Sequence, residues 1–308
     1  MKQKMIILTG PTAVGKTELS IALAHRLGGS IISADSMQIY KYMDIGTAKI
    51  KPEEMGGIPH YLVDELLPSE EFHVVRFQQM AKQALEEIYA QNRIPIVVGG
   101  TGFYIQALLY DIDFAGTGEE SSIRKNLERI AKEEGAEVLH ARLQEVDPES
   151  AKIIHPNNVK RTIRALEFYE ETKTPISAHN EEQRQKESPY DFRYFVLTHD
   201  RGILYERIEQ RVDQMLQEGL VEEVRHLKDM GYTRDMVSMQ GLGYKEILSY
   251  LDEEISLDQA VSILKRDTRH FAKRQLTWFR RERDVIWLDK REYPTTDVLL
   301  SKIEENLW

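Results

Sequence analysis

The sequence predicts an α/β fold, with a mostly parallel β-sheet flanked by helices and an inserted all-helical domain. Three observations lead to this prediction. Short apolar runs alternate with segments of helical periodicity, which is typical of a parallel sheet covered on both faces. A glycine-rich motif follows the first apolar run and opens a helix. Finally, one long stretch in the middle of the chain shows helical periodicity alone.

The strands are predicted from short apolar runs that end at turn signals. They cover residues 5–9, 31–34, 92–98, 192–197 and 285–288. Helices are predicted between them, at residues 17–27, at residues 75–90 and in a block from 203 to about 275. This alternation favours parallel strands joined by crossover helices.

The stretch from about residue 117 to about residue 188 shows helical periodicity and no strand pattern. Its helices are predicted at residues 121–134, 136–145 and 158–172, separated by Gly135 and by Asp147-Pro148. We therefore expect a helical insertion domain of residues 117–188. It would interrupt an α/β core built from residues 1–116 and 189–308, the latter including a helical and basic segment.

Composition describes a soluble globular chain. The 308 residues carry a net charge of −10 and are 41% hydrophobic, enough for about two domains. The absence of cysteine excludes disulfides, cysteine nucleophiles and thiolate zinc sites. No apolar run has the length of a membrane helix, and the first residues lack a cleavage pattern. We expect a cytoplasmic monomer without a membrane partner.

One stretch of the chain is strongly basic, although the net charge of the whole chain is negative. Residues 264–283 contain eight lysines and arginines and only two acidic residues. A net acidic chain repels phosphates, but a local run of this kind can bind them. The alternative is a solvated helix face. The local charge, rather than the net charge, will decide the partner.

The glycine-rich motif fits G-x-x-x-x-G-K-[ST] in full and stands between a strand and a helix, as a phosphate-binding P-loop requires. It consists of Gly10, Pro11, Thr12, Ala13, Val14, Gly15, Lys16 and Thr17. Backbone N–H groups and the helix N-terminus attract an anion, Lys16 adds a positive charge, and the Thr17 hydroxyl is a candidate Mg²⁺ ligand. A nucleoside triphosphate is the usual occupant, but any diphosphate presents the same charge.

An acidic residue follows the second strand. Asp35 should lie beside the P-loop, since ligands of open α/β sheets bind at the carboxyl ends of the strands. It could serve as a general base or a metal ligand, or simply cap a turn. The third strand ends in Gly-Gly-Thr-Gly and has no carboxylate of the kind that holds Mg²⁺ in many kinases.

Several segments together resemble the tRNA dimethylallyltransferase (tRNA isopentenyltransferase) family. They are residues 10–17, 35–40, 43–49, 99–104, 154–157, 243–246 and 268–280. Some eukaryotic members add a zinc finger, so a chain without cysteine is expected to be the bacterial form. The resemblance implies transfer of a dimethylallyl group from dimethylallyl diphosphate to N6 of the adenine 3′ to the anticodon. Mg²⁺ and the P-loop would stabilise the leaving diphosphate.

The resemblance also implies site residues. Asp35 would be the general base for adenine N6, Thr101 would hold the adenine, and Arg211 would contact the diphosphate. Arg207, one helical turn earlier, remains the alternative arginine. Residues expected to contact the tRNA anticodon stem-loop are Asp35, Ser36, Met37, Gln38, Thr101, Arg124, Val159, Lys160, Arg161, Gly243, Tyr244, Lys245, Thr268, Arg269, His270, Lys273, Arg274 and Gln275.

Further expectations concern the space around these residues. The target adenine must leave the stacked loop, so the P-loop and Asp35 are expected at opposite ends of one channel. Arg280 and Trp278 would assist in holding RNA phosphates, with Arg164 as a secondary candidate. Met80, Met215 and Met230 are expected only to fill space.

Two other functions fit parts of the sequence. An ATP-dependent small-molecule kinase would share the P-loop and the sheet. An RNA-binding module gated by a nucleoside triphosphate would share the loop and the basic stretch, without catalysis.

Overall fold

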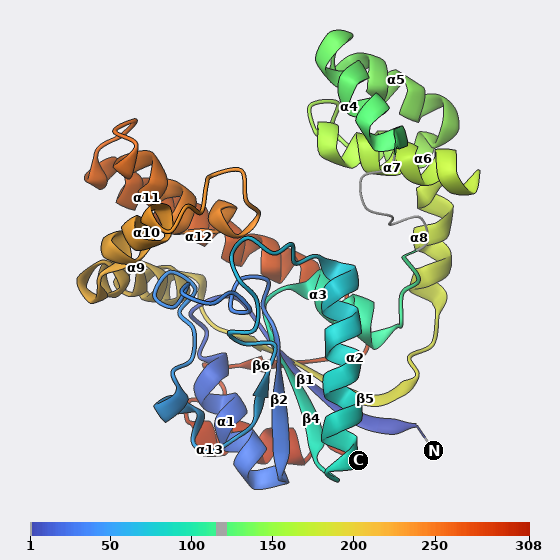
Figure 1. Cartoon of the computed structure of the whole chain (residues 1–308). Coiled ribbons are helices and arrows are strands. Elements are labelled where there is room, and N and C mark those ends of the chain that lie inside the picture. Colours follow the sequence, from blue (N-terminus) through green and yellow to red (C-terminus); the bar gives the residue numbers. More distant parts are fainter. Residues whose placement is uncertain (1, 115–121) are drawn as a thin grey trace. The chain divides into compact units, whose positions relative to one another are not determined.

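The computed structural model describes residues 2–114 and 122–308, and its centre is a parallel β-sheet (Figure 1). Within the described residues the strand order is β3-β2-β4-β1-β5-β6, and every pairing is parallel. The strands are β1 (Gln3–Thr9), β2 (Gly29–Ala34), β3 (His60–Tyr61), β4 (Ile94–Gly99), β5 (Tyr190–Thr198) and β6 (Val285–Asp289). The predicted α/β class and parallel sheet are confirmed.

Apolar side chains project from both faces of this sheet, and helices cover both faces. In β1, Ile6 and Leu8 belong to a core shared with α1 (Lys16–Leu27) and α13 (Thr296–Glu304). Successive side chains of a strand point to opposite faces, so Met5 and Ile7 face the other way, and both are fully buried. That second face is covered by α2 (Val74–Ala90) (Figure 1). The neighbouring α3 (Gly102–Leu109) packs against α2, with the rings of Phe77 and Tyr104 stacked 4.6 Å apart.

The helical block between β5 and β6 is divided by turns. It comprises α9 (Arg201–Glu218), α10 (Leu220–Asp229), the 3₁₀ turn η2 (Ser238–Gln240), α11 (Tyr244–Leu251) and α12 (Leu257–Phe279). Gly219 ends α9 with a φ of 105°, a left-handed conformation that favours glycine. A second 3₁₀ turn, η1 (Pro52–Met55), lies in the long connection from β2 to α2.

The chain divides into two compact units, one of Met1–Leu108 with Pro189–Trp308 and one of Leu109–Ser188. The second unit is helical, with α4 (Ser122–Glu133), α5 (Ala136–Val146), α6 (Pro148–Ile153), α7 (Val159–Thr172) and α8 (Ile176–Gln185). Leucines 127, 139, 143 and 166 form its core. The expected domain boundary between residues 116 and 117 and the expected helix start at Ser121 lie outside the described residues.

One strand of the sheet differs from the sequence prediction. The edge strand β3 was not predicted, because a pair of half-buried residues gives no periodicity to read. No helix in the described part of the chain is long and apolar enough to cross a membrane.

Candidate active site

The functional residues gather where three neighbouring strands end. In the sheet, Gly99 at the end of β4 is in register with Ala34 of β2 and with Thr9 of β1. A Cβ atom on Gly99 would lie 2.2 Å from the carbonyl oxygen of Ala34, so only glycine permits this approach. The P-loop, Asp35 and Thr101 therefore all leave the same edge of the sheet.

The P-loop wraps the N-terminus of α1. Gly15 precedes the helix with a φ of 91°, in the left-handed region. The Lys16 ammonium donates hydrogen bonds to the carbonyl oxygens of Gly10 and Pro11, at 3.0 and 2.9 Å. Burial, and secondarily the positive charge of Arg211, lowers the pKa of Lys16 to about 8, while Asp35 opposes the change. Lys16, Arg211 and Asp35 thus share one electrostatic environment.

A pocket of about 380 Å³ brings the three proposed catalytic residues together with the P-loop. Its polar lining includes Thr12, Asp35, Thr101 and Arg211. The residues expected to contact RNA that line it are Asp35, Ser36, Met37, Thr101, Gly243, Lys245, Thr268 and Arg274. The pocket thus joins an anion-binding loop, a carboxylate and a hydroxyl in one space.

Asp35 is held by one of its two carboxylate oxygens. Oδ1 accepts hydrogen bonds from the backbone N–H of Met37 at 2.9 Å and of Gln38 at 3.4 Å. This is an Asx turn, so the turn-capping role considered from the sequence is real. Oδ2 has no hydrogen-bond partner among the described residues and is available to a ligand.

Arg211 is a partly buried cation in the wall of this pocket. It forms no ion pair or hydrogen bond with another residue of the described chain. Burial lowers the pKa of Arg211, and the nearby Asp35 opposes that shift. A desolvated guanidinium without a paired carboxylate is costly, and an anion in the pocket would relieve that cost.

Part of the pocket wall is apolar and comes from two helices. Ile208, Val212 and Met215 of α9 face the pocket together with Leu264 and Phe271 of α12. The spacing of Ile208, Val212 and Met215 places one side of α9 along the wall. Met215, expected only to fill space, therefore belongs to the site. This wall suits a small branched hydrocarbon rather than a polar group.

Gln275 has a structural role that the sequence did not suggest. It is buried, and its side-chain oxygen accepts a hydrogen bond from the backbone N–H of Thr12 at 2.9 Å. Its side-chain nitrogen donates to the carbonyl oxygen of Gly100 at 3.0 Å. With both ends of its amide engaged by backbone groups, Gln275 fixes the P-loop against the turn that carries Thr101.

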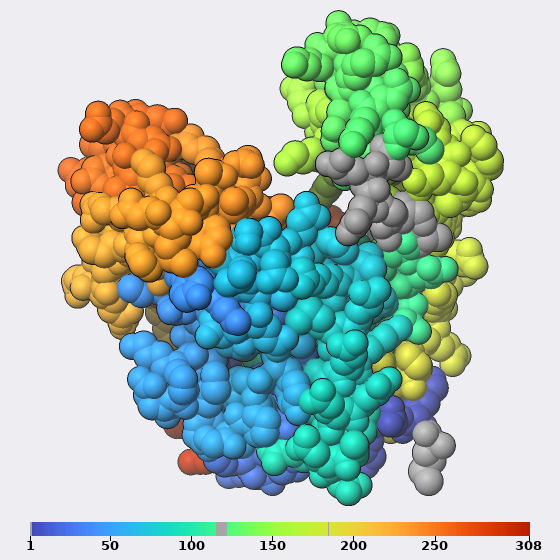
Figure 2. All heavy atoms as spheres, viewed as in Figure 1, coloured from blue at the N-terminus to red at the C-terminus, as the bar shows by residue number. Residues whose placement is uncertain are grey.

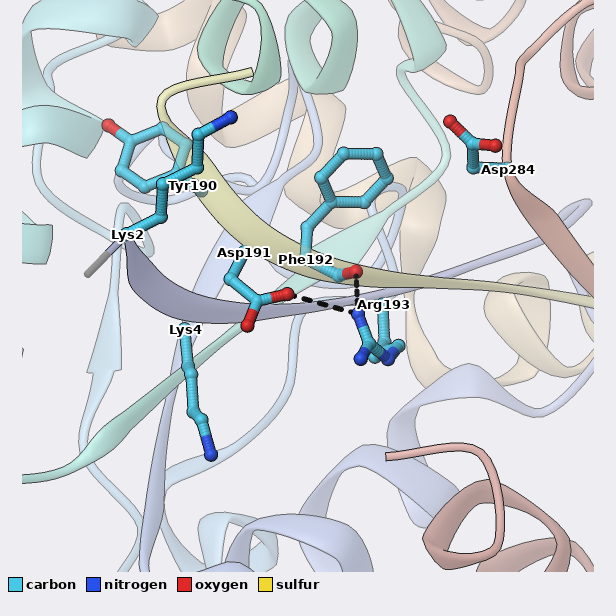
Figure 3. Close-up of a pocket in the computed structure, with 7 residues that line it drawn as sticks. All are labelled: Lys2, Lys4, Tyr190, Asp191, Phe192, Arg193 and Asp284. Atoms are coloured by element: carbon cyan, nitrogen blue, oxygen red, sulfur yellow. Dashed lines mark hydrogen bonds and ion pairs between the residues drawn. The ribbon is translucent and has the colours of Figure 1, made fainter. Parts of the chain in front are cut away.

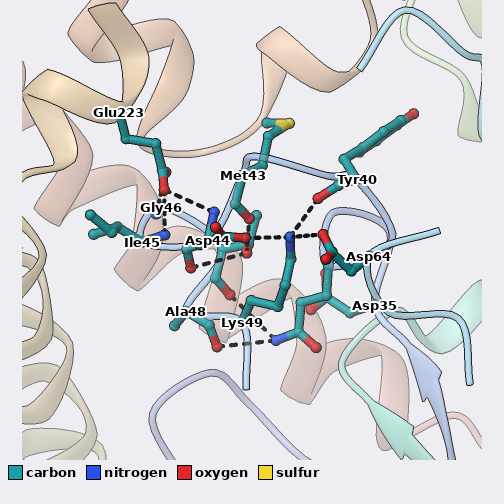
Figure 4. Close-up of polar contacts among 12 residues, drawn as sticks. Asp35, Tyr40, Met43, Asp44, Ile45, Gly46, Ala48, Lys49, Asp64 and Glu223 are labelled. Carbon is teal, nitrogen blue, oxygen red and sulfur yellow. Dashed lines mark hydrogen bonds and ion pairs between the residues drawn. The ribbon is translucent and has the colours of Figure 1, made fainter. Parts of the chain in front are cut away.

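The segment after Asp35 is anchored by two charged side chains (Figure 4). The Glu223 carboxylate accepts hydrogen bonds from the backbone N–H groups of Asp44, Ile45 and Gly46, at 2.7 to 3.0 Å. The Lys49 ammonium donates to the Tyr40 carbonyl oxygen at 2.6 Å. It also pairs with two carboxylates, Asp44 at 2.5 Å and Asp64 at 2.9 Å.

These contacts shape one side of the pocket, because Gly46 and Thr47 line it. Figure 2 shows the connection from β2 to α2, in light blue, spread over the surface next to the orange helical residues. Tyr244, expected to contact RNA, is fully buried and donates to Glu223 at 2.7 Å. Gln38, also expected to contact RNA, donates to the carbonyl oxygens of Thr47 and Ala48.

A second cavity of about 380 Å³ lies along α12 and is lined by basic and aromatic side chains. We call this cavity the basic groove. Its residues are His270, Lys273, Arg274, Thr277, Trp278 and Arg281. The Trp278 ring lies edge-on to the exposed Phe103 ring, 6.0 Å away. Arg274 also lines the main pocket, so the two cavities are adjacent at this residue. Arg269 differs, because it pairs with Glu209 at 2.5 Å.

The remaining residues expected to contact RNA belong to the helical unit. Arg124 pairs with the buried carboxylate of Glu167 at 2.7 Å. Lys160 and Arg161 are exposed in the first turn of α7, where Val159 packs against the core of this unit. Of the three cations expected to contact RNA in this unit, two are thus exposed and one is paired.

A larger cavity of about 660 Å³ lies elsewhere and lacks the chemistry of an active site (Figure 3). Lys4 and Asp191 line it at the start of β1 and β5, where the two strands pair. It therefore opens at the amino ends of the strands, away from the P-loop. Arg193 in this cavity pairs with Asp191 at 3.1 Å.

The protein itself offers few metal ligands. No group of three histidine or acidic side chains in the described part of the chain is placed to hold a metal ion. Thr17 is exposed in the first turn of α1, beside the loop. A Mg²⁺ ion there would take one hydroxyl from the protein and its other ligands from phosphate oxygens and water, which is a common arrangement for this ion.

Comparison with known proteins places the chain clearly. Residues 38–282 match the IPP transferase family. The tRNA dimethylallyltransferase of Lachnoclostridium phytofermentans is 62% identical over 301 residues, covering 98% of this chain and 96% of that protein. A crystal structure of the tRNA isopentenylpyrophosphate transferase from Bacillus halodurans has a TM-score of 0.72 and 43% identity, covering 99% and 98%. A eukaryotic dimethylallyltransferase acting on tRNA has a TM-score of 0.84 and 31% identity, covering 98% and 77%.

Proposed function

The chain belongs to the IPP transferase family, and we propose that it transfers a dimethylallyl group from dimethylallyl diphosphate to tRNA. The acceptor is N6 of the adenine 3′ to the anticodon, and the products are the prenylated tRNA and diphosphate. Relatives at 62% and 53% identity are tRNA dimethylallyltransferases, and this chain is an enzyme of the same activity.

One observation supports the roles of the residues more than any other. The P-loop residue Thr12, the carboxylate of Asp35, the Thr101 hydroxyl and the Arg211 guanidinium line a single pocket that also has an apolar lining from α9 and α12. A prenyl diphosphate has the same two parts, an anionic group and a short branched hydrocarbon. The pocket therefore accommodates the donor and leaves Asp35 at the place where the acceptor must arrive.

The transfer breaks the bond between C1 of the prenyl group and the diphosphate oxygen and forms a bond from C1 to N6. Adenine N6 is a weak nucleophile because its lone pair is delocalised into the ring. Asp35 accepts the N6 proton as the new bond forms, and Oδ2 is the oxygen left free for this. Thr101 holds the adenine, which is extruded from the anticodon loop to reach the pocket.

The negative charge that develops on the leaving diphosphate is stabilised by the P-loop backbone, Lys16 and Arg211. Thr17 would hold Mg²⁺, which when bound supplies further positive charge to the diphosphate oxygens. Its remaining ligands would be diphosphate oxygens and water, so one protein hydroxyl would suffice to hold it.

Separate labelling of two donors tests the proposal. The protein is incubated with tRNA and either labelled dimethylallyl diphosphate or labelled ATP, and the label is followed by chromatography and by mass spectrometry of the nucleosides. We expect label from dimethylallyl diphosphate in one adenosine of tRNA. Transfer of phosphate from ATP to a small acceptor, with no prenyl group on RNA, would contradict the proposal.

The lowered pKa of Lys16 predicts a pH dependence of donor binding. Because the ammonium binds the diphosphate and its pKa is about 8, the contribution of Lys16 to affinity should be constant below this pH. Above it, the neutral amine predominates, and the Kd should rise about tenfold per pH unit. Calorimetric titration with dimethylallyl diphosphate across this range measures the change.

A Lys16→Arg variant serves as the control for this titration. Its guanidinium stays charged, so its affinity should show no bend near pH 8 even if it is weaker overall. A wild-type Kd that stays level through this range would show that the charge of Lys16 does not contribute to donor binding.

For the RNA, we propose that the basic groove of α12 holds phosphates of the anticodon stem-loop. Trp278 and Phe103 provide ring faces on which unpaired bases can stack. We further propose that residues 117–188 form an insertion domain whose exposed Lys160 and Arg161 contact the same RNA. Its other candidate, Arg124, would have to exchange Glu167 for a phosphate.

Removal of two groove charges should weaken tRNA binding and its salt dependence. In a Lys273→Gln, Arg281→Gln variant, the slope of log affinity against log salt should fall by roughly one to two units, since each phosphate contact contributes about 0.7 to 0.9. Fluorescence titration of labelled stem-loop at several salt concentrations measures this. The affinity for dimethylallyl diphosphate should not change.

The matched control removes two charges from helices outside the groove. Arg26 of α1 and Lys302 of α13 each pair with a carboxylate, and an Arg26→Gln, Lys302→Gln variant changes the net charge equally. If both variants lower the slope by the same amount, the effect is one of net charge and the groove is not the binding surface.

A further inference from the structure

A second group of positive side chains lies beside the P-loop, distinct from the group formed by Lys16 and Arg211. Lys290 follows β6 and His199 follows β5, and the backbone N–H of Lys290 donates to the Thr198 carbonyl oxygen at 3.0 Å. A Cβ atom on Gly15 would lie 3.0 Å from Lys290 Nζ. The lysine therefore reaches the P-loop at the residue that precedes Lys16.

Arg207 completes this group. Burial, followed by the charge of Arg207, lowers the pKa of Lys290. Burial and then Arg207 also lower the pKa of His199. The side chains of Lys290 and Arg207 form no ion pair or hydrogen bond with another residue in the described parts of the chain. Two cations that repel each other beside an anion-binding loop are suited to an anion between them.

Three carboxylates face this group, and all of them have other partners. Glu18 accepts a hydrogen bond from the Thr296 hydroxyl at 2.8 Å. Asp200 caps α9 by accepting from the backbone N–H of Gly202 at 2.7 Å. Asp289 pairs with Arg291 at 2.5 Å. They moderate the positive potential without neutralising Lys290 or Arg207 by direct contact.

The two positive groups have different neighbours. The charges that act on Lys16 are those of Arg211 and Asp35, in the pocket that receives the acceptor. The charges that act on Lys290 are those of Arg207 and Glu18. The loop therefore lies between a positive group on the acceptor side and another beside Gly15. A diphosphate has two phosphates, and only the one bonded to the prenyl group must lie near Asp35.

We propose that Lys290 and Arg207, with His199 beside them, bind the terminal phosphate of the diphosphate, while Arg211 binds the phosphate bonded to the prenyl group. This inference rests on the proposed function and gives both arginines of α9 a role. His199 adds a donor, because its Nδ1 accepts from the backbone N–H of Asp200 at 2.7 Å and the proton is on Nε2.

The test compares two donors that differ by one phosphate. Dimethylallyl diphosphate and dimethylallyl monophosphate are titrated into wild type and into Lys290→Gln, Arg207→Gln and Arg211→Gln variants. Lys290→Gln and Arg207→Gln should each raise the Kd of the diphosphate about tenfold and that of the monophosphate by less than about twofold. Arg211→Gln should weaken both ligands.

The control is Arg225→Gln, which removes one charge from an exposed residue of α10 outside both positive groups and should leave both affinities unchanged. The proposal is overturned if Lys290→Gln and Arg207→Gln bind the diphosphate as tightly as wild type, or if they weaken the two ligands equally. The proposed function is judged separately, by whether wild type forms prenylated tRNA. A wild type that forms it while Lys290→Gln binds normally would refute only the inference.

Discussion

Replacement of Asp35 by asparagine should lower the rate of prenyl transfer by about 10²- to 10⁴-fold, the usual contribution of a general base. Asparagine keeps the Oδ1 acceptor, so the hydrogen bonds from the backbone N–H groups of Met37 and Gln38 can remain. What is lost is the second carboxylate oxygen, which accepts the N6 proton. Single-turnover transfer from labelled dimethylallyl diphosphate to tRNA measures the rate.

Binding measurements distinguish lost chemistry from lost structure. The Asp35→Asn variant should bind both tRNA and dimethylallyl diphosphate with affinities close to those of wild type. An Asp284→Asn variant is the matched control, since Asp284 is exposed, lies outside the pocket and has a φ of 54° that asparagine tolerates. Transfer by Asp35→Asn at the wild-type rate would remove Asp35 from the mechanism.

Replacement of Arg211 by glutamine should lower the single-turnover rate at saturating donor by about 10²- to 10³-fold. That is the typical cost of removing one donor from a developing oxyanion. Arg211 lines the pocket and forms no ion pair with another described residue, so the variant removes a charge without freeing a carboxylate. The rate should fall because charge on the phosphate bonded to C1 grows as the C–O bond breaks.

The comparison that matters for Arg211 is between rate and affinity. A rise in the KM for dimethylallyl diphosphate with an unchanged rate at saturation would mean that Arg211 binds the donor without stabilising the transition state. Arg225→Gln, on the exposed side of α10 and paired with Glu222 at 3.6 Å, removes an equal charge and should leave the rate unchanged.

The parts of the fold that the sequence predicted well are those encoded locally. A buried parallel strand such as β1 appears as a short apolar run, and the P-loop motif fits between this strand and α1. From these positions, the rule that ligands bind at the carboxyl ends of strands leads directly to Asp35. The same rule applied to β5 and β6 points to His199 and Lys290, a signal that was present in the sequence and was not used.

Other features depend on pairing between distant segments and could not be read from local pattern. Gln275 lies in a basic helix, yet it joins the P-loop to Gly100, more than 170 residues away in the chain. Glu223 looks like an ordinary helix carboxylate, but it accepts hydrogen bonds from three consecutive backbone N–H groups, those of residues 44–46. Position in a motif indicated that Tyr244 and Gln38 matter, but not that their contacts are within the protein.

The central claim is that the P-loop binds a departing diphosphate while the prenyl group points toward Asp35. A crystal structure with an unreactive dimethylallyl thiodiphosphate tests it most directly. The account predicts the diphosphate within the loop of residues 10–17, and the hydrocarbon against Met215 and Phe271 with C1 open toward Asp35. A diphosphate bound elsewhere, or a hydrocarbon directed away from the pocket that contains Asp35, would contradict it.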